Sequence, residues 1–147
     1  MAKGFTQVIE KDYEETYTSI AYLKSVYLVY TIAALQQLCL WQIDFLSAFL
    51  NSDNSYEIFM EQLRGFKEEG DNYIWRLCKT LYGTMQGAYD WTKNLDKTFE
   101  DHSFYKSRAD PQIHSRVYGD KLTLTFTWTD DILGALSTIE GKNLAKS

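Results

Sequence analysis

The strictest constraint on the fold is a segment near the C-terminal end in which apolar and polar side chains alternate without a break. Every second residue from Leu122 to Trp128 is large and apolar, and threonines fill the positions between them. Successive side chains of a β-strand point to opposite faces of a sheet, so this alternation predicts a strand over 121–129. Gly119-Asp120 separates it from 112–118, and we therefore expect the two segments to form a β-hairpin.

The remaining segments favour a mixed fold. Residues 19–37 lack Gly and Pro and repeat apolar residues at helical spacing on more than one side, which predicts a well-buried helix. A second helix is predicted over 84–101, with Trp91, Leu95 and Phe99 on one face. Other predicted elements are a buried strand at 38–44, a helical turn at 45–51, a loop at 64–72 and strands at 56–62, 73–78 and 132–136. Hairpin-connected strands mixed with helices predict an α+β fold with an antiparallel sheet packed against helices.

Composition narrows the class of protein. A length of 147 residues with 45% hydrophobic and 16% aromatic residues predicts one globular domain. No apolar run approaches the roughly 18 residues that span a bilayer, and the start of the chain lacks a signal peptide's apolar core. Cys39 and Cys78 lie in apolar surroundings, which favours buried thiols in a reducing compartment, cytoplasm or nucleus. The net charge of −5 argues against a free-standing nucleic-acid binder, because such proteins usually present a basic patch.

Three aspartates stand at the ends of predicted strands. Asp130 and Asp131 follow the alternating strand, and Asp44 ends the run 38–44. Carboxylates that converge on one edge of a sheet are suited to Mg2+, and two such ions about 3.5–4 Å apart support nucleotidyl transfer. A turn is the simpler interpretation of the Asp pair, and a helix N-cap is the simpler one for Asp44. Both interpretations stay open, since an Asp-Asp turn without Gly is not a preferred hairpin and adjacent carboxylates repel each other without a cation.

Three further residues have ordinary structural interpretations when each is taken alone. Phe49 is expected to be a core aromatic residue, and Gly83 a turn residue. Gln86 is expected to be a solvent-exposed residue near the start of the second helix.

Seven short blocks occur in a fixed order along almost the whole chain. They are Ala2–Gln7, Asp12–Thr16, Gln42–Asn51, Glu57–Gln62 with Gly65-Phe66, Leu81–Gln86 with Trp91, Ala109–Pro111, and Trp128–Asp131. Together they make the sequence similar to the reverse transcriptase domain of copia-type LTR retrotransposons. The last block stands where that family has Tyr-Val-Asp-Asp.

The resemblance implies a polymerase palm with partial fingers over residues 1–147, with no thumb and no ribonuclease H domain. It implies a catalytic triad that binds two Mg2+ ions, formed by Asp44, Asp130 and Asp131. It also implies contacts to the incoming nucleotide from Phe49, Gln86 and Ala48. The implied substrates are an RNA or DNA template with an annealed primer, and deoxynucleoside triphosphates. The implied setting is a polyprotein with protease, integrase and ribonuclease H.

The sequence also departs from the family pattern. Residues 86–89 are Gln-Gly-Ala-Tyr where the family usually has Gln-Ala-Pro-Arg, and Met85 occupies a site that is usually basic. The chain ends soon after Asp131. We therefore expect a reverse transcriptase by descent that is inactive as an isolated fragment. An alternative of a different class is a host-adopted module that contacts proteins without catalysis, which predicts an exposed apolar patch.

Overall fold

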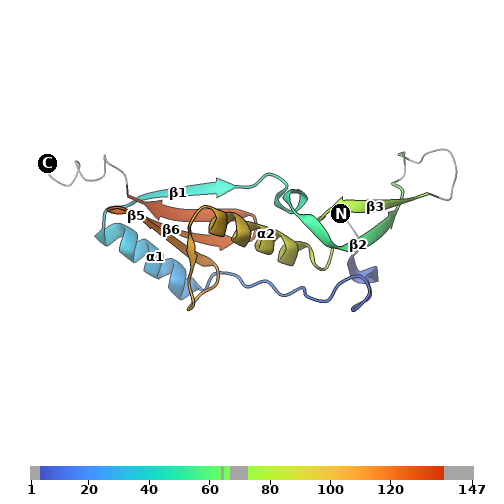
Figure 1. The fold of residues 1–147 in the computed structure, drawn as a ribbon, viewed down its shortest axis with the longest axis horizontal. Helices are drawn as coiled ribbons and strands as arrows, with labels where there is room; N and C mark the ends of the chain where they lie inside the picture. The colour runs from blue at the N-terminus through green and yellow to red at the C-terminus, as the bar shows by residue number, and fades with distance from the viewer. Residues whose placement is uncertain (1–3, 64, 67–72, 138–147) are drawn as a thin grey trace. The chain divides into compact units, whose positions relative to one another are not determined.

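The structure, a computed structural model, describes residues 4–63, 65–66 and 73–137 (Figure 1). Its elements in chain order are η1 (Gly4–Thr6), α1 (Leu23–Leu35), β1 (Cys39–Asp44), η2 (Ala48–Asn51), β2 (Asp53–Glu61), β3 (Ile74–Lys79), α2 (Gly87–Asp101), β4 (Tyr105–Lys106), β5 (Ile113–Tyr118), β6 (Lys121–Trp128) and β7 (Asp131–Leu136). Helices combined with antiparallel strands confirm the predicted α+β class. Of the predicted loop 64–72, all but 65–66 lies outside the described residues.

The chain forms two compact units, and each is described by itself. The first unit contains Met1–Thr18 and Ser47–Asn94, and the second contains Ser19–Leu46 and Leu95–Ser147. Within the part of the chain that is described, no helix is long and apolar enough to cross a membrane.

A five-stranded antiparallel sheet forms the centre of the second unit, with the strand order β1-β7-β6-β5-β4. The hairpin predicted from the alternating pattern is β5–β6, in which Tyr118 pairs with Lys121 across Gly119-Asp120. A second hairpin joins β6 to β7, and β1 pairs with β7 at the edge of the sheet (Figure 1). The predicted strands at both of these hairpins are therefore confirmed.

Helical segments cover both faces of this sheet. On one face, Val26 and Val29 of α1 form a core cluster with Leu124 and Phe126 of β6. Thr125 lies between these two strand residues, so it faces the other side, and there it is fully buried. The C-terminal part of α2 packs on that second face, because Phe99 stacks on His114, the cross-strand partner of Thr125.

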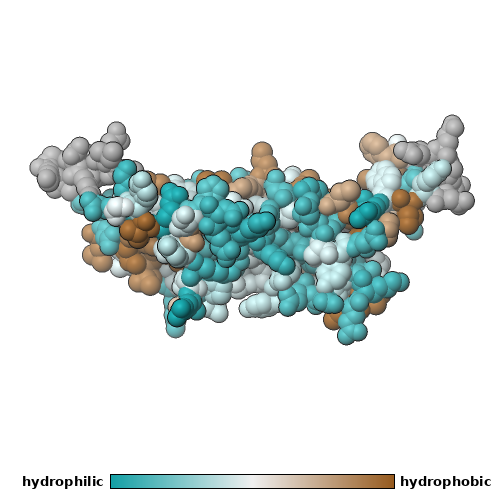
Figure 2. Space-filling model, in the orientation of Figure 1, coloured by the Kyte–Doolittle hydropathy of each residue, from teal (hydrophilic) through white to brown (hydrophobic). Residues whose placement is uncertain are grey.

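The first helix is less buried than its sequence predicts. Its buried residues are Val26, Val29 and Ala33, whereas Leu23 and Tyr27 are 59% and 60% exposed. The prediction of a well-buried helix is wrong because a helix on one sheet face buries a single stripe, whatever the composition of its other sides. Figure 2 shows apolar side chains at the surface over α1.

The predicted burial of β1 and of the two cysteines is also wrong. Among the described strands, β1 is an edge strand with β7 as its single neighbour, and its residues Leu40 and Ile43 are exposed. Cys39 lies on this edge strand, and Cys78 lies on β3 of a two-stranded sheet, so both thiols are exposed. Strands with few neighbours bury little, even when their residues are apolar.

In the first unit, β2 and β3 form the two-stranded antiparallel sheet, and η2 precedes it. Thr80, which follows β3, is completely buried and ties the sheet to η2. Its backbone N–H donates to the Ser52 carbonyl at 3.0 Å, and its hydroxyl donates to the Phe49 carbonyl. These bonds fix the backbone that carries Phe49.

Candidate functional site

Asp44 and Asp131 lie directly opposite each other on neighbouring strands. Asp44 is the last residue of β1, and the strand register pairs it with Asp131, the first residue of β7. At the next position, the backbone N–H of Phe45 donates to the carbonyl of Asp130 at 3.1 Å. Bonded and non-bonded pairs alternate along an antiparallel ladder, so Asp44 and Asp131 form a non-bonded pair. In such pairs the Cα atoms are about 4.5 Å apart, and cross-strand partners share one face.

A glutamine holds one of these two carboxylates. Nε2 of Gln42 donates to Oδ1 of Asp131 at 3.0 Å. Gln42 precedes Asp44 by two positions on β1, so both side chains lie on one face of the strand. Asp44 is exposed and Asp131 is partly buried. Like charges directly across a strand pair are destabilising, so this edge of the sheet favours a neutralising partner.

Asp130 lies in the tight turn between β6 and β7. Trp128 pairs with Asp131, which leaves Thr129 and Asp130 as the two turn residues. Thr129 has a φ of +52°, in a region that β-branched residues rarely adopt. The turn interpretation of the Asp pair therefore applies to Asp130 and not to Asp131. The N-cap interpretation of Asp44 is wrong, because η2 begins at Ala48 and its N-cap is Ser47.

The three aspartates fit a metal site in their chemistry and backbone placement. Carboxylate oxygens are the ligands that Mg2+ prefers, and two of the three residues face each other across one strand pair. Among the described residues, however, no three His, Cys, Asp or Glu side chains form a group that could hold a metal ion. Within the described part of the chain, the Asp131 carboxylate is hydrogen-bonded to Gln42 and not to a metal-ligand group.

In the first unit, Phe49 packs against the turn that leads through Gln86 into α2. The Phe49 ring stacks on Tyr82, with ring centroids 4.3 Å apart. A Cβ atom added to Gly87 would lie 3.3 Å from Cδ2 of Phe49, so the residue after Gln86 packs against this ring. Phe49 and Ala48 are both buried. The core interpretation of Phe49 is therefore confirmed, whereas Gln86 is 0% exposed and its predicted solvent exposure is wrong.

The N-terminal segment is bonded to the same turn. The backbone N–H of Gly4 donates to the carbonyl of Gly83 at 2.8 Å, and Gly83 has the positive φ that the predicted turn requires. Oε1 of Gln7 accepts the Met85 N–H at 2.8 Å, and Nε2 of Gln7 donates to Oε1 of Gln86 at 3.1 Å. Sequence reasoning missed Gln7 as a site residue, because no periodicity or spacing relates it to residue 86.

Comparison with known proteins identifies the family. The family model described as "Reverse transcriptase (RNA-dependent DNA polymerase)" matches residues 1–145. The chain belongs to the reverse transcriptase family.

The relatives of this reverse transcriptase chain are transposon proteins. It is 28% identical over 155 residues to the retrovirus-related Pol polyprotein from transposon TNT 1-94 of Nicotiana tabacum, covering 100% of the chain and 12% of the relative. It is 28% identical over 134 residues to the Pol polyprotein from transposon RE1 of Arabidopsis thaliana, covering 90% of the chain and 9% of the relative. The chain therefore spans about a tenth of the length of these relatives. These matches confirm the predicted copia-type relationship. No solved structure matches.

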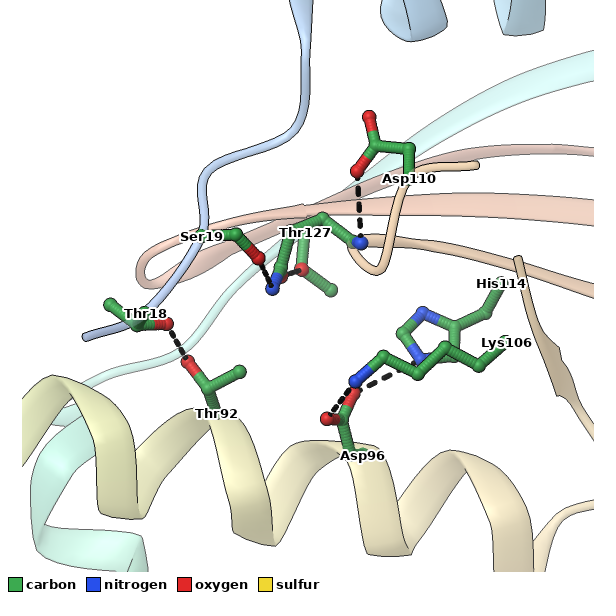
Figure 3. Close-up of polar contacts among 9 residues, drawn as sticks. Thr18, Ser19, Thr92, Asp96, Lys106, Asp110, His114 and Thr127 are labelled. Atoms are coloured by element: carbon green, nitrogen blue, oxygen red, sulfur yellow. Dashed lines mark hydrogen bonds and ion pairs between the residues drawn. The ribbon is translucent and has the colours of Figure 1, made fainter. Parts of the chain in front are cut away.

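Polar contacts in the second unit of the reverse transcriptase chain join α2 to the sheet (Figure 3). The buried His114 ring lies with Nε2 3.1 Å from Oδ1 of Asp96, and Lys106 forms an ion pair with the other Asp96 oxygen. Burial alone would raise the pKa of Asp96, but the hydrogen bonds and charges of His114 and Lys106 outweigh it and lower that pKa. The carboxylate thus stays charged in the folded protein at neutral pH.

A buried carboxylate, that of Asp110, fixes the start of α1. Asp110 accepts the Gln112 N–H at 3.0 Å and the Tyr22 N–H at 2.8 Å, and Tyr22 is the N-cap residue of α1. The Gln112 side chain in turn donates to Ser19 at 2.9 Å and accepts from Thr127 of β6 (Figure 3). These contacts hold the segment before α1 against the strand that leads to Asp130.

Proposed function

We propose that the chain carries the palm and part of the fingers of an RNA-directed DNA polymerase, with Asp44, Asp130 and Asp131 as its metal-binding catalytic residues. The observation that supports this most is the register that pairs Asp44 with Asp131, with Asp130 as the adjoining turn residue. These three carboxylates would hold two Mg2+ ions, which would supply the acidification of the primer 3′-hydroxyl and the charge stabilisation of the leaving pyrophosphate. The proposed substrates are a template with an annealed primer, and deoxynucleoside triphosphates.

The proposed role of the protein's own residues is to hold the metal ligands and the incoming nucleotide in position. Asp44 and Asp131 are fixed by the ladder between β1 and β7, so their separation is set by regular strand geometry and not by a loop. In the first unit, we assign the nucleotide contacts to Phe49, Gln86 and Ala48. The Phe49 ring stacks on Tyr82, and the Phe49 carbonyl accepts from the Thr80 hydroxyl, so both its side chain and its backbone are held in place. In the proposed role it packs beneath the sugar of the incoming nucleotide and excludes a 2′-hydroxyl.

We further propose that the isolated chain has no polymerase activity and that it worked within a Pol polyprotein. A net charge of −5 gives little attraction for a template and primer, whose phosphates need basic partners. Loss of about 1 Å in the placement of reacting groups can cost about a hundredfold in rate. Primer extension by the isolated chain in the presence of Mg2+ or Mn2+ would contradict this part of the proposal.

Manganese binding tests the metal assignment without depending on activity. Electron paramagnetic resonance of added Mn2+ is expected to show binding to the unaltered chain and its loss in Asp44→Asn and Asp131→Asn. Asp120→Asn is the matched control, because Asp120 is an exposed aspartate in the turn of the other hairpin. Equal binding by all four proteins, or none by the unaltered chain, would refute the metal site.

One observation favours the second candidate, a non-catalytic protein-interaction module. Apolar side chains lie at the surface over α1 (Figure 2), and the exposed residues of this helix include Leu23, Tyr27 and Leu28. Exposed apolar patches often mark protein contacts. This function predicts partner binding that survives chelation of metal and Asp44→Asn but is lost in Leu28→Glu. Polymerase function predicts instead that the function is lost on chelation of metal and in Asp44→Asn.

A further inference from the structure

The contacts of Gln7 fix the orientation of two side-chain amides. A backbone N–H can only donate, so the atom of Gln7 that faces Met85 N–H must be its oxygen. The other Gln7 atom is then the amino group, and the Gln86 atom that receives its hydrogen bond must be an oxygen. Glutamine oxygen and nitrogen are often assigned only from their surroundings, and here the backbone of Met85 decides both.

This orientation leaves the amide nitrogen of Gln86, which carries two N–H donors, without an acceptor. With Oε1 turned to Gln7, Nε2 of Gln86 faces away from it. That nitrogen is buried and has no hydrogen-bond partner among the described residues. A buried donor without an acceptor costs about 1–3 kcal/mol, and unsatisfied groups of this kind call for an explanation such as a ligand.

We propose that Gln7 is a positioning residue that sets which amide atom of Gln86 is available to the incoming nucleotide. This inference rests on the proposed function, and it names the ligand group: an acceptor oxygen on the sugar or the phosphates of a deoxynucleoside triphosphate. Gln86 is 0% exposed, so the contact requires the side chains that cover it to move when the nucleotide binds.

The N-terminal segment is held in one position against the turn before α2, as a positioning role for Gln7 requires. A Cβ atom on Gly4 would lie 2.1 Å from the carbonyl oxygen of Gly83. Any other residue at position 4 would therefore push the N-terminal segment away from the turn at Gly83. Together with the bond from Gly4 to Gly83, the two bonds of Gln7 place this segment on the turn at three points. The turn and the Gln86 amide are therefore held from outside α2.

Two substitutions at Gln7 distinguish a role in orienting the Gln86 amide from a purely structural role. Gln7→Glu keeps the length and places two acceptor oxygens toward Met85 and Gln86, so the Gln86 amide should invert and turn its own oxygen outward. Gln7→Met removes both bonds but leaves Gln86 free to take either orientation. Gln7 is only partly buried, so a carboxylate there is tolerated. Gln36→Glu, at an exposed position after α1, controls for the added charge.

Two measurements on these variants test whether Gln7 orients Gln86. In nuclear magnetic resonance of the 15N-labelled chain, the Gln86 side-chain amide protons are expected to shift downfield in Gln7→Glu, because they gain a carboxylate acceptor. In titrations with a deoxynucleoside triphosphate and Mg2+, the affinity should fall about tenfold or more in Gln7→Glu and less in Gln7→Met. Thermal stability should show the opposite order, with Gln7→Met the less stable variant.

A purely structural role predicts that Gln7→Met is the worse variant in both measurements, and this result would overturn the proposal. Unchanged Gln86 amide resonances in Gln7→Glu would also overturn it, because they show that Gln7 does not orient Gln86. If the unaltered chain binds no nucleotide, the proposed function fails and the nucleotide role with it. The amide resonances still decide whether Gln7 sets the orientation, so the two failures are distinguishable.

Discussion

Replacement of Asp44 by Asn is predicted to make the metal-free protein more stable. Asp44 and Asp131 are cross-strand partners, so their carboxylates repel each other. At a separation of about 5 Å, the Coulomb energy is about 0.8 kcal/mol in water and about 3 kcal/mol at an effective dielectric constant of about 20. Asp44 is exposed, so the lower value applies, in agreement with the roughly 0.2–1 kcal/mol typical of cross-strand pairs. We therefore expect Asp44→Asn to raise the free energy of unfolding by about 0.5–1 kcal/mol.

Bound metal is expected to reverse which protein is more stable, the unaltered chain or Asp44→Asn. An ion that binds only the folded state stabilises it by about 1.4 kcal/mol when its concentration is about ten times its dissociation constant. The unaltered chain gains this stabilisation, and Asp44→Asn, which lacks one ligand, does not. The unaltered protein is thus expected to be less stable than the variant in EDTA and more stable than it in excess Mg2+.

Urea denaturation followed by tryptophan fluorescence measures both conditions, with Asp120→Asn as the control. Raising the salt concentration in EDTA should shrink the difference between the unaltered chain and Asp44→Asn, because salt screens exposed charges. A variant that is less stable than the unaltered chain in EDTA would refute the repulsion argument. Equal gains from Mg2+ in both proteins would refute the role of Asp44 as a ligand.

Two further predictions concern the sheet. Gly134→Ala should destabilise the chain by about 1–3 kcal/mol in urea denaturation, since the new Cβ atom would lie 2.5 Å from the Leu124 carbonyl oxygen and 2.7 Å from the Trp41 ring; unchanged stability would contradict this packing. Because its pKa is lowered in the folded state, Asp96 contributes stability that is present above its ordinary pKa of about 3.9 and is lost as the pH falls through the lowered value. Asp96→Asn should therefore be less stable at neutral pH and lose less stability on acidification, and parallel pH profiles of the two proteins would refute this.

Patterns within one segment predicted the local structure well. The alternation in β6 and the turn at Gly119-Asp120 determine the β5–β6 hairpin without help from the rest of the chain. The helical spacing of Trp91, Leu95 and Phe99 likewise predicted the buried side of α2, and all three side chains are buried. Each of these patterns extends over several turns or strand positions, so a single segment carries enough information.

Burial and partner choice could not be predicted in this way. The apolar residues of α1 and β1 are as hydrophobic as those of the core, but Leu23 and Leu40 remain exposed. Their exposure depends on which side of the helix meets the sheet and on whether the strand has one neighbour or two. Both are consequences of long-range pairing, and a strand's own sequence does not specify its place in the sheet.

The family, the α+β class and the β5–β6 hairpin follow from the residues alone, as does the occurrence of Asp44, Asp130 and Asp131 directly after apolar strand segments. The pairing of Asp44 with Asp131 and the hydrogen bond between Gln7 and Gln86 emerge only in the folded chain. Side-chain periodicity repeats along one segment, whereas strand register and buried hydrogen bonds join residues far apart in the sequence, which meet only when the whole chain has folded.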